Sequence, residues 1–92
     1  MNAPGATVSE RIRQRLAALH PESLEIQDDS AAHAGHAGAR AGGGHYSIVI
    51  VSPAFAGQPA QRRHRMVYAA LGAMMTQEIH ALAIQAYAPD EI

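Results

Sequence analysis

The sequence predicts an α+β fold in which one sheet packs against helices, with the α/β class as the alternative. Two observations lead to this prediction. Hydrophobic patterns follow one another in the order helix, strand, strand, helix, strand, and such elements bury their apolar faces most economically as one sheet under helices. The last two strands are also separated by a helix of about four turns, which favours a right-handed parallel crossover. Strands one and two are expected to pair antiparallel, so the three-stranded sheet is mixed.

The first helix is expected to run from Thr7 to about His20. Thr7-Val8-Ser9-Glu10 fits a capping box, in which the Thr7 hydroxyl and the Glu10 carboxylate each accept a backbone N–H. Apolar residues then recur at helical spacing on one stripe: Val8, Ile12, Leu16 and Leu19. Pro21 prevents the helix from continuing.

Two strands come next, separated by a long segment. Residues 23–28 alternate Leu24 and Ile26 with polar residues, which indicates a strand with one wet face. Residues 45–52 are rich in β-branched side chains and predict a strand that is covered on at least one face.

A turn, a second helix and a third strand complete the predicted elements. Two prolines and a glycine punctuate residues 53–59, which we expect to form a turn with a short helical piece, anchored to the core by Phe55. The helical period returns from about Ala60 to Thr76, although Gly72 weakens its middle. The strand at 79–87 follows. Strict alternation would place four of its residues on one face: His80, Leu82, Ile84 and Ala86.

Histidines are concentrated in the segment from residue 28 to 45, which holds His33, His36 and His45. Parallel pairing of strands two and three would start both strands at the same edge of the sheet, so His80 is expected near this segment. Imidazole is a ligand for zinc, copper or iron, so His33, His36 and His80 form a candidate metal site. The alternative is structural, with loop histidines in solvent and His80 hydrogen-bonded at a strand end.

Composition excludes several functions. Seven Arg against eight Asp and Glu give a net charge of -1, which argues against a dedicated polyanion binder. The absence of Cys excludes disulfides, a thiol nucleophile and a cluster held by the chain's own thiolates. Neither a secretory signal nor a membrane-length apolar run is present, which predicts a cytoplasmic protein without a membrane partner. No nucleophile motif or triad is present, so we expect no enzymatic activity.

A cationic cluster lies at the start of the second helix, where Arg62, Arg63 and Arg65 flank His64. Cations oppose the helix dipole at this end, so a phosphate or carboxylate partner is attractive. The alternative is a fold-stabilising role, with an arginine or His64 paired to Asp28 or Asp29.

Several of these segments together resemble the BolA family, from about Ser9 to Glu91. The matching segments are LEIQDDS, the following HAGH, HYSIVIVSPAFAG, RRHRMVYAAL and IHALAIQAYAPDEI. The resemblance implies a class II KH-like fold with the order α-β-β-α-α-β and a three-stranded mixed sheet. Residues 1–6 are then a flexible tail and 7–92 a single BolA-like domain.

The resemblance also implies a function. BolA-like proteins pair with monothiol glutaredoxins and share a two-iron, two-sulfur (2Fe-2S) cluster with them, in cluster trafficking or iron and redox regulation. The implied ligands are His80 and a loop histidine, His33 or alternatively His36. Glutaredoxin and its bound glutathione would supply thiolates, so this chain would hold no cluster alone.

The alternative is that the protein is a transcriptional regulator that binds nucleic acid. The KH-like surface and three arginines, Arg62, Arg63 and Arg65, would then contact DNA. KH domains clamp the nucleic-acid backbone with a G-x-x-G loop. No such tetrapeptide joins two helices in this sequence, and the net charge of -1 also disfavours this function.

Overall fold

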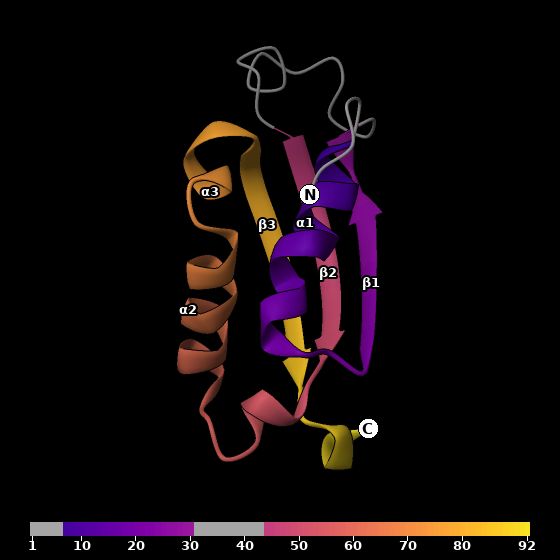
Figure 1. Ribbon diagram of the computed structural model, residues 1–92, viewed down its shortest axis with the longest axis vertical. Helices are drawn as coiled ribbons and strands as arrows, with labels where there is room; N and C mark the ends of the chain where they lie inside the picture. Colours follow the sequence, from indigo (N-terminus) through magenta and orange to yellow (C-terminus); the bar gives the residue numbers. More distant parts are fainter. Residues whose placement is uncertain (1–6, 31–43) are drawn as a thin grey trace.

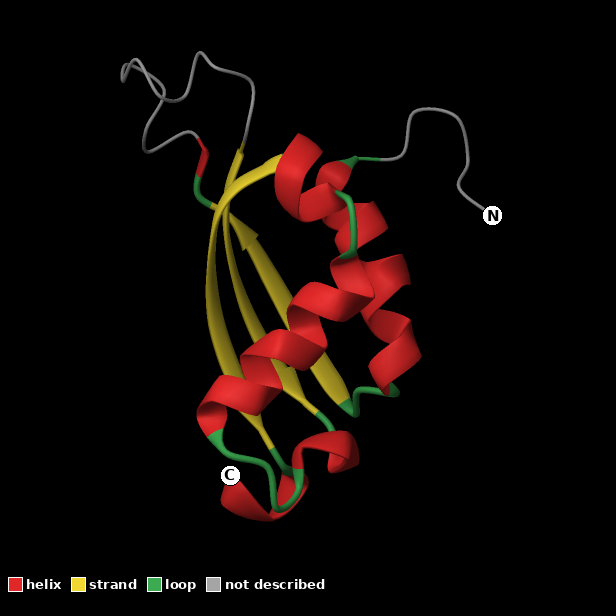
Figure 2. Cartoon of the chain, turned by 90° about the vertical axis from the view of Figure 1, so that its left-hand side faces the viewer, coloured by secondary structure: helices red, strands yellow, loops and turns green. Residues whose placement is uncertain are grey.

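The computed structural model describes residues 7–30 and 44–92. The predicted flexible tail, residues 1–6, lies outside this range. The described elements are α1 (Val8–Leu16), η1 (Ala17–Leu19), β1 (Ser23–Asp28), β2 (Gly44–Val51), η4 (Pro53–Phe55), α2 (Ala60–Leu71), α3 (Met74–Gln77), β3 (Ile79–Tyr87) and η5 (Pro89–Glu91). Figure 1 shows the three strands side by side, and Figure 2 shows the helices packed on one face of the sheet. No helix in the described ranges is long and apolar enough to cross a membrane.

The sheet has the mixed topology that the sequence predicted. β2 lies between β1 and β3; it pairs antiparallel with β1 and parallel with β3. The parallel pair requires a crossover, which α2 and α3 supply. As a result β2 and β3 begin at the same edge of the sheet, at the upper end of Figure 1.

The core fills the space between the helices and the sheet. Ile12 and Leu16 of the predicted α1 stripe are fully buried, while Val8 and Leu19 pack at its margin. The other large, fully buried hydrophobic residues come from β2, η4 and α2: Ile48, Ile50, Phe55, Val67 and Leu71. Phe55 therefore anchors the turn after β2, as expected.

The first helix starts as predicted, and the predicted helical stretch ends near His20, although its last turn, Ala17–Leu19, is a 3-10 helix. Both hydrogen bonds of the capping box are present: the Glu10 N–H donates to the Thr7 hydroxyl and the Thr7 N–H donates to the Glu10 carboxylate. The chain leaves the helix at His20, which has a left-handed backbone with φ of 51°.

The second predicted helix is divided in two. α2 ends at Leu71, and Gly72 adopts φ of 57°, a conformation that breaks a right-handed helix. α3 then runs over four residues. The single helix predicted from 60 to 76 is therefore wrong at Gly72. The BolA resemblance implies two consecutive helices between the second and third strands, and this order is correct.

Candidate metal centre

Two imidazole rings meet where β2 and β3 begin. The ring centroids of His45 and His80 are 5.1 Å apart and the rings are tilted by 45°. This contact confirms that parallel pairing brings His80 to the end of the segment that precedes β2. An imidazole nitrogen lies about 2.0–2.1 Å from a bound metal and about 1.1 Å from its own ring centroid, so two rings on one tetrahedral metal have centroids about 5 Å apart. The spacing of this pair fits a shared metal.

A β-bulge directs His80 toward His45. Gly44 pairs with Ile79, whereas His45 pairs with Ala81, so His80 is the extra residue on β3. Strict alternation predicted His80 on the face of Leu82, and this prediction is wrong. Ile79 takes the core position at 3% exposure, and His80 is exposed beside His45.

Residues just after β1 hold the backbone of His45. The Asp29 N–H donates to the His45 carbonyl at 2.7 Å, and the His45 N–H donates to Ser30 Oγ at 3.0 Å. Asp29 also accepts a hydrogen bond from the Ser47 hydroxyl at 2.5 Å. The N–H and the carbonyl of His45 are therefore both hydrogen-bonded to Asp29 and Ser30, the two residues that follow β1.

Gly44 allows the chain to pass close to Tyr46. A Cβ at Gly44 would lie 2.5 Å from Tyr46 Cε2 and 2.9 Å from Ser30 Oγ. Tyr46 is buried, and burial, with the nearby Asp28 charge, raises the pKa of its phenol. The Gly44 N–H donates to the Glu78 carbonyl at 3.1 Å, which ties the start of β2 to the residue before β3.

An ion pair between Arg11 and Glu78 fastens the same edge of the sheet to α1. Glu78 directly precedes β3, so the pair fixes the helix layer to the strand that carries His80. The histidine pair is therefore built on segments that are held from both the helix side and the β1 side.

The histidine pair alone would make only part of a metal ligand set. His33 and His36, the loop ligands implied by the BolA resemblance, lie outside the described residues. Among residues 7–30 and 44–92 no group of three or more His, Cys, Asp and Glu side chains is arranged to hold a metal. Two neutral imidazoles suit one iron of a cluster whose other ligands come from a second molecule, so the donor set fits a shared cluster.

The three arginines of the cationic cluster on α2 differ in their contacts: Arg63 is hydrogen-bonded to other elements, whereas Arg62 and Arg65 are exposed. Arg63 donates two hydrogen bonds to the Glu91 carboxylate, at 2.6 and 2.8 Å, and others to the Gln58 and Ala86 carbonyls. The two bonds from Arg63, together with one from the Ala88 N–H, lower the pKa of Glu91 from 4.5 to about 2. The Arg62 and Arg65 side chains are exposed.

The fold-stabilising alternative is correct for Arg63, but the expected partner was wrong. Asp28 accepts a hydrogen bond from the Ser30 N–H, and Asp29 accepts one from Ser47. The start of α2 lies at the opposite end of the sheet from the histidine pair, so no contact with either aspartate is possible (Figure 1).

His45 is the member of the site that sequence reasoning did not select as a ligand. The available signal was its position directly at the start of the predicted second strand, opposite the start of the third. Asp29 and Ser30 could not be recognised from spacing, because they act across a gap of 15 or more residues.

Comparison with known proteins gives a consistent result. The family model described as BolA-like protein matches residues 16–91. SufE-like protein 1 of Arabidopsis thaliana, chloroplastic/mitochondrial, is 41% identical in an alignment of 88 residues that covers 89% of this chain and 24% of that protein. The chain thus spans about a quarter of that relative's length.

A bacterial relative and a solved structure match over more of their own length. The Escherichia coli (strain K12) DNA-binding transcriptional regulator BolA is 38% identical over 81 residues, 87% of this chain and 74% of that protein. The solved BolA domain of SufE1 from Arabidopsis thaliana is 38% identical and superposes with a TM-score of 0.81, covering 95% of this chain and 98% of that domain.

Proposed function

The chain belongs to the BolA family, and from this premise we propose that it is a non-enzymatic interaction protein that binds a monothiol glutaredoxin and shares a 2Fe-2S cluster with it. The observation that carries the proposal is the pair of imidazoles at the edge of the sheet, His45 and His80, with ring centroids 5.1 Å apart. This pair offers ligands for one iron but is not a complete site.

His80 is the first proposed ligand because it is exposed and lies on β3, which pairs with the central strand. The second imidazole has three candidates. His45 is favoured by its distance from His80, and His33 and His36 by the BolA resemblance. Three residues of chain span at most about 11 Å, so His33 is within reach of Ser30, whose hydroxyl accepts a hydrogen bond from His45.

The remaining ligands must be thiolates from outside this chain, which has no cysteine. The glutaredoxin cysteine and glutathione would provide them. Replacing thiolate by imidazole on one iron raises the reduction potential of a 2Fe-2S cluster relative to all-thiolate ligation. The proposed role in cluster trafficking or iron and redox regulation follows from this mixed ligation.

Reconstitution tests the proposal. This chain and a monothiol glutaredoxin are mixed with iron, sulfide and glutathione, and visible absorption and circular dichroism are recorded. His80→Ala is expected to abolish the spectrum of the mixed complex and leave the spectrum of the glutaredoxin alone. His45→Ala, His33→Ala and His36→Ala, singly and in pairs, identify the second ligand.

The matched control is His20→Asn, which replaces an exposed histidine directly after η1 and keeps a residue that tolerates its left-handed backbone. This variant is expected to form the wild-type complex. A wild-type spectrum for His80→Ala would show that His80 is not a ligand.

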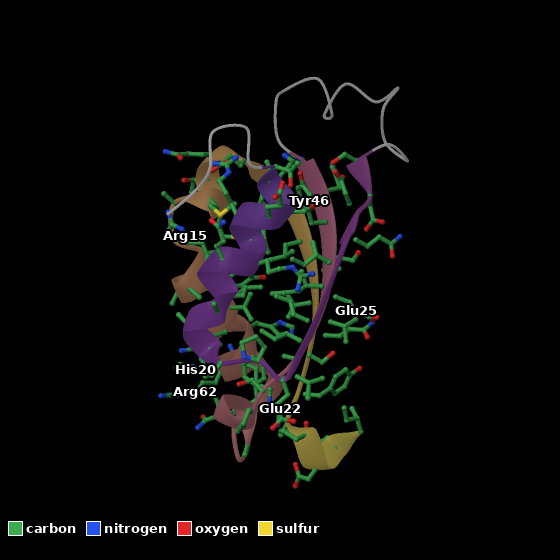
Figure 3. All side chains as sticks on the ribbon, turned by 45° about the vertical axis from the view of Figure 1, so that its right-hand side comes forward. Arg15, His20, Glu22, Glu25, Tyr46 and Arg62 are labelled. Carbon is green, nitrogen blue, oxygen red and sulfur yellow. The ribbon has the colours of Figure 1, made fainter. Side chains whose placement is uncertain are left out.

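The second candidate function, binding of nucleic acid, has one structural observation in its favour. All six arginines in the described part of the chain lie on α1 and α2, so the helix layer is basic although the whole chain has a net charge of -1. Figure 3 shows Arg15 and Arg62 on this layer. The name of the E. coli relative describes that protein as DNA-binding.

The structure changes which arginines we propose for phosphate contacts. Arg62 and Arg65 are exposed, and so is Arg15 on α1, whereas Arg63 is bound to Glu91. The double variant Arg62→Ala/Arg65→Ala should weaken binding to duplex DNA and reduce the slope of log affinity against log salt by about 1 per lost contact, measured by fluorescence anisotropy. An unchanged slope would contradict phosphate contacts by these residues.

A further inference from the structure

One face of the sheet carries no helix from residues 7–30 and 44–92. In Figure 2 the helices cover only the face that buries the core. The opposite face, here called the open face, is formed by residues that alternate with the core residues along the strands. They include Glu25 and Gln27 on β1, Ser47 and Val49 on β2, and Ala81, Ala83 and Gln85 on β3.

The open face is hollowed by two adjoining depressions. One, of about 520 Å³, is lined by β1 and β2 and includes Glu25, Asp28 and Val49. The other, of about 320 Å³, is lined by β2 and β3 and includes His45 and Ala83. Ser47 lines both depressions, so they adjoin at the central strand. The lining of the smaller depression includes three small residues, Ser47, Ala81 and Ala83, which leave this part of the sheet accessible to a second molecule.

The charge on the open face has a single sign within the described residues. Glu25 and Asp28 line the larger depression and Asp29 lines the smaller one, and neither depression includes an arginine. Every described arginine belongs to α1 or α2, on the other side of the sheet. Figure 3 shows this separation, with Glu25 on one side of β1 and Arg15 and Arg62 on the helix layer.

The smaller depression connects this face to the metal centre. His45 lines it together with Ala81 and Ala83, and His80 lies beside His45. A molecule that reaches the His45 ring therefore approaches over the open face, because α1, α2 and α3 cover the other face.

We infer that the open face is the docking surface for the protein that completes the metal centre, and that this partner places lysine or arginine side chains against Glu25, Asp28 and Asp29. The inference rests on the proposed function, because it takes the partner to be the protein that supplies the thiolates. Complementary charge chiefly accelerates association and selects the partner, while the small residues allow close contact between the two surfaces.

A pair of matched substitutions tests this inference. Ala83→Arg adds a large cation to the open face, and Ala69→Arg adds the same side chain to the exposed surface of α2. Binding of each variant to a monothiol glutaredoxin, with and without its cluster, is measured by isothermal titration calorimetry, and folding is checked by circular dichroism. Ala83→Arg is expected to weaken binding at least about tenfold, because like charges and bulk oppose docking. Ala69→Arg should stay within about twofold of wild type.

Glu25→Lys provides a second variant that changes charge at the rim of the depression. It should lower the association rate and reduce its dependence on salt, as measured by stopped-flow fluorescence. If Ala83→Arg and Glu25→Lys bind like wild type, the docking surface lies elsewhere and the inference is overturned while the proposed function stands. If wild type binds glutaredoxin in neither form, the proposed function itself fails.

Discussion

Arg63 and His45 both take their roles from residues that are distant in sequence. Arg63 bonds Glu91, 28 residues away, and so joins α2 to the end of the chain. His45 is bonded by Ser30, 15 residues away. Neighbouring residues of the same type differ in role, since Arg62 and Arg65 are exposed. The residue type indicated the chemistry of each side chain. The hydrogen-bond partner, Glu91 or Ser30, determined the role that the residue has in the fold.

Glu91→Gln should reduce stability in a pH-dependent manner. The folded-state pKa of Glu91 is lowered from 4.5 to about 2 by its bonds to Arg63 and the Ala88 N–H. Its ionised form therefore stabilises the fold fully above about pH 4.5 and loses that contribution as the pH falls toward 2. In urea unfolding, wild type is expected to exceed the variant at pH 7, and the difference should shrink between pH 4.5 and 2. The exposed carboxylate variant Glu25→Gln is the control; a difference independent of pH would contradict the prediction.

Gly44→Ala should disturb the histidine pair. The added Cβ would lie 2.5 Å from the Tyr46 ring and 2.9 Å from Ser30 Oγ, so the start of β2 must shift. Overpacking of this kind costs about 1–3 kcal/mol. Denaturant unfolding measures the loss, and nuclear Overhauser contacts between the His45 and His80 rings report their separation. Wild-type stability together with unchanged ring contacts would disprove the clash.

At the scale of elements, two local irregularities decide how the regular pieces are used. The bulge on β3 exposes His80 and buries Ile79. The break at Gly72 turns one long helix into α2 and α3, and Met74 of α3 enters the core at 3% exposure. Hydrophobic periodicity locates the helices and strands. An inserted residue or a residue with positive φ then changes which side chains face the core, and periodicity does not predict this.

Gly72→Ala should destabilise the protein by about 1–3 kcal/mol, the cost of holding a residue with a Cβ in a sparsely allowed backbone region. Its φ is 57°, while a Cβ there would lie 3.5 Å from Arg15 Nη1, an ordinary contact. The cost therefore arises from the backbone and not from crowding. Guanidinium unfolding measures it, with Ala73→Gly as the neighbouring control. A neutral Gly72→Ala would mean that α2 and α3 can join into one helix.

At the scale of the whole molecule, the two faces of the sheet differ in burial and in charge. The helix side forms the core and carries the arginines, whereas the open face carries acidic residues and the hollow beside His45. A net charge of -1 conceals this separation. Charge balance computed over the chain therefore underestimates the field that each face presents to a partner.

Phe55→Ala should remove a large part of the total stability. Phe55 is fully buried in the core, and truncating a buried phenylalanine costs about 3–5 kcal/mol, against about 5–15 kcal/mol for a whole domain. Calorimetry is expected to show a Tm lower by at least about 10 °C. Pro53→Ala, at an exposed position of the same turn, is the control. A shift of only 1–2 °C would show that Phe55 is not an anchor of the core.

The sequence by itself determined the three strands, the start of α1 with its capping box, the mixed sheet and the nearness of His80 to the start of β2, but not the division of the second helix at Gly72. Each of these depends on interactions between residues close in the chain or on the handedness of a crossover. Only the tertiary structure decided that His45 faces His80, that Arg63 binds Glu91 and that the open face is acidic. These features depend on where a bulge shifts the strand phase and on which distant segments meet across the sheet, and neither is encoded in local spacing.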